Sequence, residues 1–150
     1  MKVVAIYRAS CSSKVRFPLY MCPVPAGSPS SVEDYIEDEI DLNDFIKHPD
    51  KTFLLHVAGD SMINAGINHG DMLMVERTTE LMELDIAIAV VNGDLTVKQL
   101  KWENNGIVLL AANPNYKPLR VSPDDDFHVW GVVIGIVRDL PRGTKLLGQP

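Results

Sequence analysis

Two residues of this sequence, Ser61 and Lys98, are of types that can perform nucleophilic catalysis together. Ser61 follows Ala58-Gly59-Asp60 at the end of an apolar segment, so we expect its hydroxyl on a tight turn that a substrate can approach. Lys98 lies in the middle of the β-rich segment 95–100. A serine attacks a carbonyl carbon when a base takes its proton, and a neutral lysine amine is such a base.

The setting of Lys98 favours that neutral form. The segment 86–91, its expected hairpin partner, is apolar at every position and should be buried on both faces. An apolar setting disfavours the ammonium form. Lys98 would then take the proton from Ser61 and return it to the leaving amine, while backbone N–H groups of Ser61 and Met62 hold the oxyanion. Taken singly, Ser61 also fits a turn former, and Lys98 a lysine with a packed stem and a hydrated head.

A candidate substrate lies in the same chain. Residues 1–26 contain four basic residues and no acidic one, and they end in the proline-rich stretch Cys22-Pro23-Val24-Pro25-Ala26-Gly27. Closely spaced prolines exclude helix and favour extended backbone, which predicts an extended N-terminal arm. Ala26 and Gly27 are small, so the bond between them can enter a narrow cleft. A flexible linker explains the same composition.

The segment after the arm has helical spacing. Ser30 with Glu33 fits a capping box, and apolar residues recur at helical intervals as far as Ile40, which predicts a short acidic helix. Asp41 can cap a further turn or two over residues 42–47 before Pro49 ends it.

From Pro49 onward, short β-rich runs alternate with turn signals. Asn92-Gly93 and Asn105-Gly106 separate three of these runs and predict hairpins that join them in an antiparallel meander. The runs are 53–57, 72–75, 86–91, 95–101, 107–111, 119–121 and 127–137. We therefore expect a mainly β domain of strongly bent antiparallel sheets over residues 27–140, which begins with the short helix, is preceded by the arm 1–26 and is followed by a flexible tail, 141–150.

Composition narrows the functional classes. With 150 residues, 46% of them hydrophobic, the chain can bury a core without disulfides or metal. A net charge of -6 argues against direct sequence-specific DNA binding, which requires clustered Lys and Arg. Cys11 and Cys22 lack metal-ligand spacing, and no apolar run is long enough to span a membrane. We expect a cytoplasmic protein without cofactor, metal or membrane contact.

Several short motifs occur in order along the chain. Beyond the Ala26-Gly27 pair, they are Ala58-Gly59-Asp60-Ser61-Met62, Gly70-Asp71, Thr96-Val97-Lys98, Asn113-Pro114-Asn115-Tyr116 and Val129-Trp130-Gly131-Val132-Val133. Together these motifs resemble the UmuD/LexA family of self-cleaving Ser/Lys peptidases. The resemblance covers about Phe17 to Val137.

The resemblance implies that Ser61 is the nucleophile, Lys98 the base and Ala26–Gly27 the cleaved bond, in autocatalytic cleavage stimulated by the RecA filament on single-stranded DNA. It also implies a homodimer. LexA-type repressors carry a helix-turn-helix domain before the cleavage site, and residues 1–26 are too few for one. The UmuD-like branch fits better, and it implies that the trimmed product joins a UmuC-like Y-family polymerase in SOS mutagenesis.

Two other interpretations stay open. A type I signal peptidase relative would use a similar Ser–Lys pair, but such enzymes need a membrane anchor. A non-catalytic dimeric binding module would retain Ser61 and Lys98 without using them. The sequence also leaves open whether the arm is cut by its own subunit or by the neighbouring one, and which polymerase is the partner.

Overall fold

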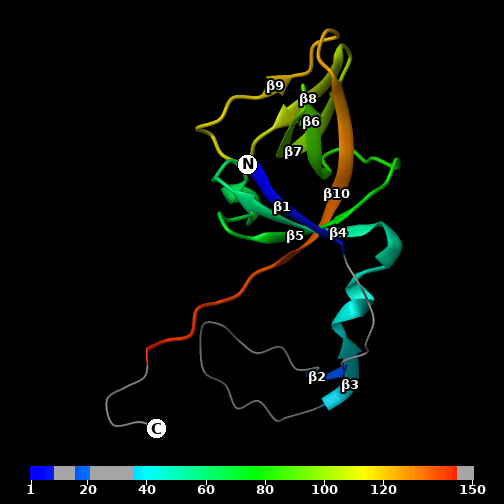
Figure 1. Cartoon of the computed structure of the whole chain (residues 1–150), viewed down its shortest axis with the longest axis vertical. Helices are drawn as coiled ribbons and strands as arrows, with labels where there is room; N and C mark the ends of the chain where they lie inside the picture. The colour runs from blue at the N-terminus through cyan, green and yellow to red at the C-terminus, as the bar shows by residue number, and fades with distance from the viewer. Residues whose placement is uncertain (9–15, 21–35, 145–150) are drawn as a thin grey trace. The chain divides into compact units, whose positions relative to one another are not determined.

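The computed structural model describes residues 1–8, 16–20 and 36–144. The chain forms two compact units, one made of Met1–Arg8 with Lys51–Pro150 and the other of Ala9–Asp50. The first unit contains an eight-stranded antiparallel sheet (Figure 1). Its strands are β1 (Lys2–Arg8), β4 (Thr52–Ala58), β5 (Met72–Glu76), β6 (Ile86–Val91), β7 (Asp94–Glu103), β8 (Gly106–Leu110), β9 (Leu119–Arg120) and β10 (Phe127–Val137).

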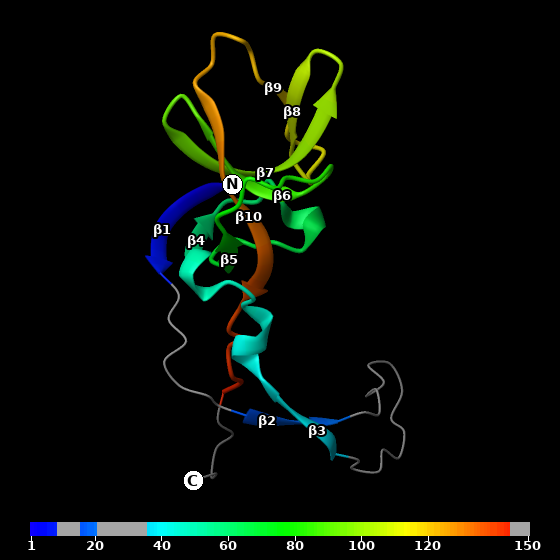
Figure 2. The same cartoon turned by 90° about the vertical axis from the view of Figure 1, so that its right-hand side faces the viewer.

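The sheet closes into a barrel. Its strand order is β1-β4-β5-β10-β6-β7-β8-β9, and an additional pairing of Lys2 with Thr96 joins β1 to β7. β10 is shared between two halves, because residues up to Val132 pair with β6 and residues from Val132 onward pair with β5. Register shifts near Gly131 and Gly135 accompany the pronounced curve of β10 in Figure 2. The prediction of a mainly β fold with strongly bent sheets is confirmed.

All seven β-rich runs identified in the sequence coincide with strands β4 to β10, and β6–β7–β8 form the expected meander. In the β6–β7 turn both central residues have positive φ, 50° at Asn92 and 86° at Gly93. These values fit a type I′ turn, whose twist matches that of the strands. In the β7–β8 turn Gly106 has positive φ, 126°, and Asn105 does not, so the predicted hairpin forms but its turn differs in conformation from that at Asn92-Gly93.

The core is divided into two clusters, which lie on opposite faces of β6, since Ile88 belongs to the larger cluster and its neighbours Ala87 and Ala89 to the smaller one. The larger cluster gathers side chains from strands on both sides of the barrel and from the loop after β4, and it includes Met1. Its other buried members are Leu55, Val57, Met62, Ile67, Leu73, Val75, Ile88 and Val97. The smaller cluster is Ala87, Ala89, Leu100 and Leu109. The loop that contains Ser61 is therefore anchored in the core through Met62 and Ile67, both at most 1% exposed.

The second unit contains a two-stranded antiparallel sheet of β2 (Arg16–Tyr20) and β3 (Ile36–Asp41). The helix predicted up to Ile40 is wrong over 36–40, and its earlier part lies outside the described residues. In a helix, acidic residues of this segment that are three and four positions apart would be neighbours and would repel each other. Pairing with β2 as a strand supplies backbone hydrogen bonds instead.

Two short 3-10 helices follow β3: η1 (Leu42–Phe45) and η2 (Pro49–Lys51). Asp41 caps η1 as expected, because its side chain accepts a hydrogen bond from Asn43 N at 2.9 Å. Residues 1–26 were expected to form one extended arm. Of these residues, Lys2–Arg8 form strand β1 of the eight-stranded sheet.

Candidate active site

Ser61 lies on the tight turn that leaves β4. Gly59, two residues earlier, has φ of +103°, which a residue with a side chain rarely adopts. The chain then enters the 3-10 helix η3 (Ile63–Ala65), where Ile63 N donates to Asp60 O at 3.2 Å. Ser61 itself is only 1% exposed. The turn therefore holds the serine hydroxyl at one place inside the barrel wall, as a nucleophile requires.

The structure brings Ser61 and Lys98 together. Lys98 Nζ lies 3.1 Å from Ser61 Oγ, although the residues are far apart in sequence. Lys98 is half-buried in the middle of β7, opposite the fully buried Ala87 of β6. This separation is short enough for direct proton transfer between the hydroxyl and an unprotonated amine.

Asn113 and Tyr116, which were given no catalytic role from the sequence, lie next to the Ser61–Lys98 pair. Asn113 Nδ2 donates to Asp60 O at 3.0 Å, and the Tyr116 hydroxyl donates to the Asp60 carboxylate. The Tyr116 ring also lies 5.6 Å from Lys98 Nζ. The bond to the Asp60 carboxylate raises the pKa of Tyr116 above its ordinary value. Both residues belong to the motif Asn113–Tyr116, and its polar and aromatic types were the available signal.

The loop after Ser61 is fastened at its far end by Asp71. Arg138 Nε and a terminal guanidinium nitrogen donate to the two carboxylate oxygens of Asp71, each at 2.6 Å, and Arg138 also donates to Gly66 O at 2.7 Å. Asn68 N donates to Asp71 at 2.7 Å. Chiefly through the hydrogen bonds from Arg138, the pKa of Asp71 is held below its ordinary value. The ion pair thus ties the loop that contains Ser61 to the end of β10.

A third group meets Ser61: the N-terminal amine of Met1 donates a hydrogen bond to Ser61 Oγ. Burial, the nearby positive charge of Lys98 and a hydrogen bond with Lys98 lower the pKa of this amine from 8.0 to about 5, against an opposing effect of Asp60. The amine is therefore mostly neutral at pH 7 in this position. Sequence reasoning missed this contact, because it depends on the long-range pairing of β1.

Of the remaining predicted site residues, the structure describes those of the expected oxyanion site but not those of the expected cleavage site. Ser61 and Met62, whose backbone N–H groups were expected to hold an oxyanion, occupy the turn between β4 and η3. Ala26 and Gly27 lie outside the described residues. Over residues 1–8, 16–20 and 36–144, no group of three or more His, Cys, Asp or Glu side chains is arranged to hold a metal ion. In the same part of the chain, no helix has the length and hydrophobicity needed to cross a membrane.

A closed barrel of bent β-strands with a serine and a lysine in contact at its wall is an arrangement found among serine peptidases that work without histidine. The chain belongs to the Peptidase S24-like family, whose pattern matches residues 18–134.

Individual relatives agree with this assignment. A LexA repressor from Oleidesulfovibrio alaskensis is 40% identical over 112 residues, which cover 75% of this chain and 54% of the repressor. A LexA repressor from Colwellia psychrerythraea is 36% identical over 116 residues, or 77% of this chain and 55% of the repressor. Protein SamA from Salmonella typhimurium is 38% identical over 121 residues, covering 80% of this chain and 84% of SamA. The match thus spans about half the length of the LexA repressors and most of SamA.

Proposed function

We propose that this protein cleaves its own Ala26–Gly27 bond, with Ser61 as the nucleophile and Lys98 as the base. The observation that carries the proposal is the 3.1 Å contact between Lys98 Nζ and Ser61 Oγ at the barrel wall. A buried serine without a base is unreactive, whereas one beside an unprotonated amine can be activated. Membership of the Peptidase S24-like family supports the same reaction.

The proposed reaction passes through an ester. Lys98 Nζ takes the hydroxyl proton of Ser61 as Oγ bonds to the carbonyl carbon of Ala26. The resulting oxyanion accepts hydrogen bonds from the N–H groups of Ser61 and Met62. The bond to Gly27 N then breaks, and Lys98 gives its proton to that nitrogen.

Hydrolysis of the ester completes the cycle. Lys98, again unprotonated, takes a proton from water as the water oxygen attacks the ester carbon, and returns it to Ser61 Oγ as the ester bond breaks. The products are a chain that ends at Ala26 and a chain that begins at Gly27. Because the substrate belongs to the same chain, positioning of the arm can replace tight binding of a separate substrate.

We further propose that the cytoplasmic homodimer is stimulated to cleave by the RecA filament on single-stranded DNA, and that the trimmed product acts as an accessory subunit of a UmuC-like Y-family polymerase in the SOS response. Two features support this biological role: the resemblance of the motifs to the UmuD-like branch, and the match to SamA over 84% of its length. The net charge of -6 fits a protein that acts at DNA by binding partner proteins and does not bind DNA directly.

The test is an intact-mass measurement after incubation with RecA, single-stranded DNA and a nucleotide that keeps the filament active. We expect two new fragments, one ending at Ala26 and one beginning at Gly27, and neither in a Ser61→Ala variant. An uncut chain, with the filament verified on a known substrate, would instead favour the non-catalytic binding module.

A further inference from the structure

Met1 is bound between β7, which contains Lys98, and the turn after β4, which contains Ser61. Its backbone carbonyl accepts hydrogen bonds from Val97 N and from Thr96 Oγ1, each at 2.9 Å. Its amine donates to Ser61 Oγ, and the residue is only 8% exposed. Gly59 is also close, since a Cβ on it would lie 3.6 Å from Met1 Cα. The first residue of the chain therefore fills the space beside the nucleophile.

This occupancy is incompatible with attack on a peptide bond. Ser61 Oγ is in contact with both the Met1 amine and Lys98 Nζ, and these two nitrogen groups also interact with each other. For attack, the oxygen must turn a lone pair toward a carbonyl carbon while its proton passes to Lys98. The Met1 amine stands where atoms of the scissile bond have to lie.

β1 continues from Met1 as an added strand on the edge of β4. The two strands pair antiparallel from Lys2 opposite Ala58 to Arg8 opposite Phe53. Main-chain pairing at a sheet edge is how many proteins bind extended peptides, because it needs little from the side chains. β1 thus occupies an edge that leads directly to Ser61 and that suits an extended peptide.

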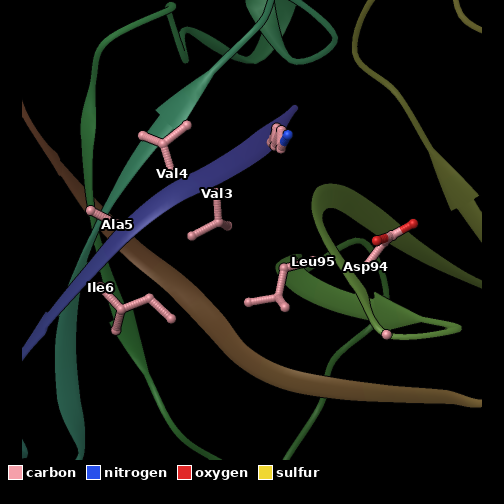
Figure 3. A pocket seen from close by; sticks show the side chains of 8 residues that line it. Val3, Val4, Ala5, Ile6, Asp94 and Leu95 are labelled. Atoms are coloured by element: carbon pink, nitrogen blue, oxygen red, sulfur yellow. The ribbon is translucent and has the colours of Figure 1, made fainter.

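On its other side, β1 is held only at its start. Lys2 pairs with Thr96, but beyond it β1 diverges from the β6–β7 hairpin and leaves a pocket, whose walls include Val3 of β1 and Leu95 of β7 (Figure 3). Val4, Ile6 and Tyr7 are 57%, 44% and 52% exposed. Detachment of β1 therefore exposes few side chains of its own: Met1 loses its burial, and Val3 and Ala5 lose their partial burial.

We propose that β1 is an internal inhibitor of self-cleavage: it occupies the peptide-binding edge of β4 with Met1 at Ser61, and it has to leave before Ala26–Gly27 reaches the nucleophile. The inference rests on the proposed function and adds a step that controls it. A partner that binds the form with β1 released raises the cleavage rate by shifting this equilibrium, without any change in the catalytic residues.

A reversible disulfide between β1 and β4 tests the proposal. Tyr7 lies opposite Leu54 in the register, and directly opposed residues of antiparallel strands have Cα atoms about 4.5–5.5 Å apart, within the disulfide range. The test protein is the full chain with Tyr7→Cys and Leu54→Cys, and with Cys11→Ser and Cys22→Ser to prevent mispairing. Leu54→Cys alone, in the same background, is the control for oxidation.

We expect the oxidised protein to cleave itself about tenfold more slowly or worse than the same protein after reduction, because locking β1 lowers the competent fraction. The control should cleave equally in both states. Equal rates for the locked and reduced double variant, with the cross-link verified by mass, would overturn the proposal, since the substrate would then reach Ser61 with β1 in place.

A second readout separates this inference from the proposed function. A fluorophosphonate probe labels an activated serine without requiring the Ala26–Gly27 bond. If the reduced protein is labelled at Ser61 but never cut, the proposed cleavage is wrong, while slower labelling of the locked form still supports occlusion by β1. Equal labelling of both forms, or none in either, would overturn the inference.

Discussion

Arg138 and Asp71 join the last strand of the barrel to the loop that contains the proposed nucleophile. Two hydrogen bonds of 2.6 Å hold the guanidinium against the carboxylate, which is 2% exposed. Two parallel hydrogen bonds fix orientation as well as distance. Because Arg138 also donates to Gly66 O, one side chain restrains two points of the loop between Ser61 and β5.

Arg138→Ala should therefore loosen this loop and slow self-cleavage by about 10-fold to 10²-fold, since small displacements of a nucleophile have effects of this size. The variant should also unfold at a lower temperature, because it leaves the carboxylate of Asp71 buried without its partner. Arg142→Ala, which changes an exposed arginine nearby, is the control. Unaltered cleavage in Arg138→Ala would show that the loop keeps its geometry without the ion pair.

The stability effect should depend on pH. Arg138 holds the pKa of Asp71 below its ordinary value of 3.8, so the native state favours the charged carboxylate. The stabilisation is then complete above about pH 4 and is lost as pH falls through the lowered pKa. Thermal unfolding of the parent protein and Arg138→Ala should differ at pH 7 and converge in strong acid. A constant difference over that range would contradict this account.

Removal of either member of the proposed catalytic pair should stop cleavage or slow it strongly. Ser61→Ala lacks the nucleophile, and Lys98→Ala should lower the rate by about 10²–10⁴-fold, the usual contribution of a general base. Lys101→Ala is the matched control, because Lys101 is an exposed lysine on the same strand. Intact mass gives the rate and thermal unfolding checks that each variant is folded. Normal cleavage by Lys98→Ala would remove the lysine from the mechanism.

The barrel strands could be predicted from sequence because each is a short β-rich run next to a turn signal. Asn92-Gly93 illustrates this, since both residues adopt the positive φ that their types favour. The Ser61–Lys98 contact could be predicted through motifs, although the two residues meet only after the barrel has closed. Such a contact follows from the fold and not from local spacing.

The errors also have physical causes. Residues 36–40 have apolar spacing that fits a helix, but pairing with β2 overrides this local preference. The run Val3 to Tyr7 is rich in β-branched and aromatic residues and could have been identified as a strand. The position of this strand against β4, and the contact of Met1 with Ser61, could not have been identified, because they join residues far apart in the sequence, such as Lys2 with Ala58 and Met1 with Ser61.

Gly131 offers a test of the tight packing in β10. A Cβ at this position would lie 2.7 Å from Val75 Cγ1 and 2.9 Å from Glu76 O, so Gly131→Ala forces the backbone of β5 to move. We expect a loss of about 1–3 kcal/mol in the free energy of unfolding. Gly135→Ala should cost less, because its close contact at 2.3 Å is the terminal methyl of the flexible Met74. Gly143, with nothing within 4 Å, provides the control. Denaturant unfolding that ranks Gly135→Ala as the more damaging variant would contradict this comparison.

The attachment of β1 should weaken as pH falls. In the docked state the pKa of the Met1 amine is about 5, against an ordinary value of 8.0, so the detached strand binds more protons between these values. Docking is then strongest above about pH 8 and weakens progressively toward pH 5. The charged groups that act on the amine are Lys98, which disfavours its protonation, and Asp60, which favours it.

Amide exchange should show falling protection of Lys2–Arg8 over this range while β6 stays protected. An N-terminally acetylated chain, which has no amine to titrate, should lack this dependence, and equal protection of β1 at pH 8 and pH 5 in the unmodified chain would show that the amine does not control its docking.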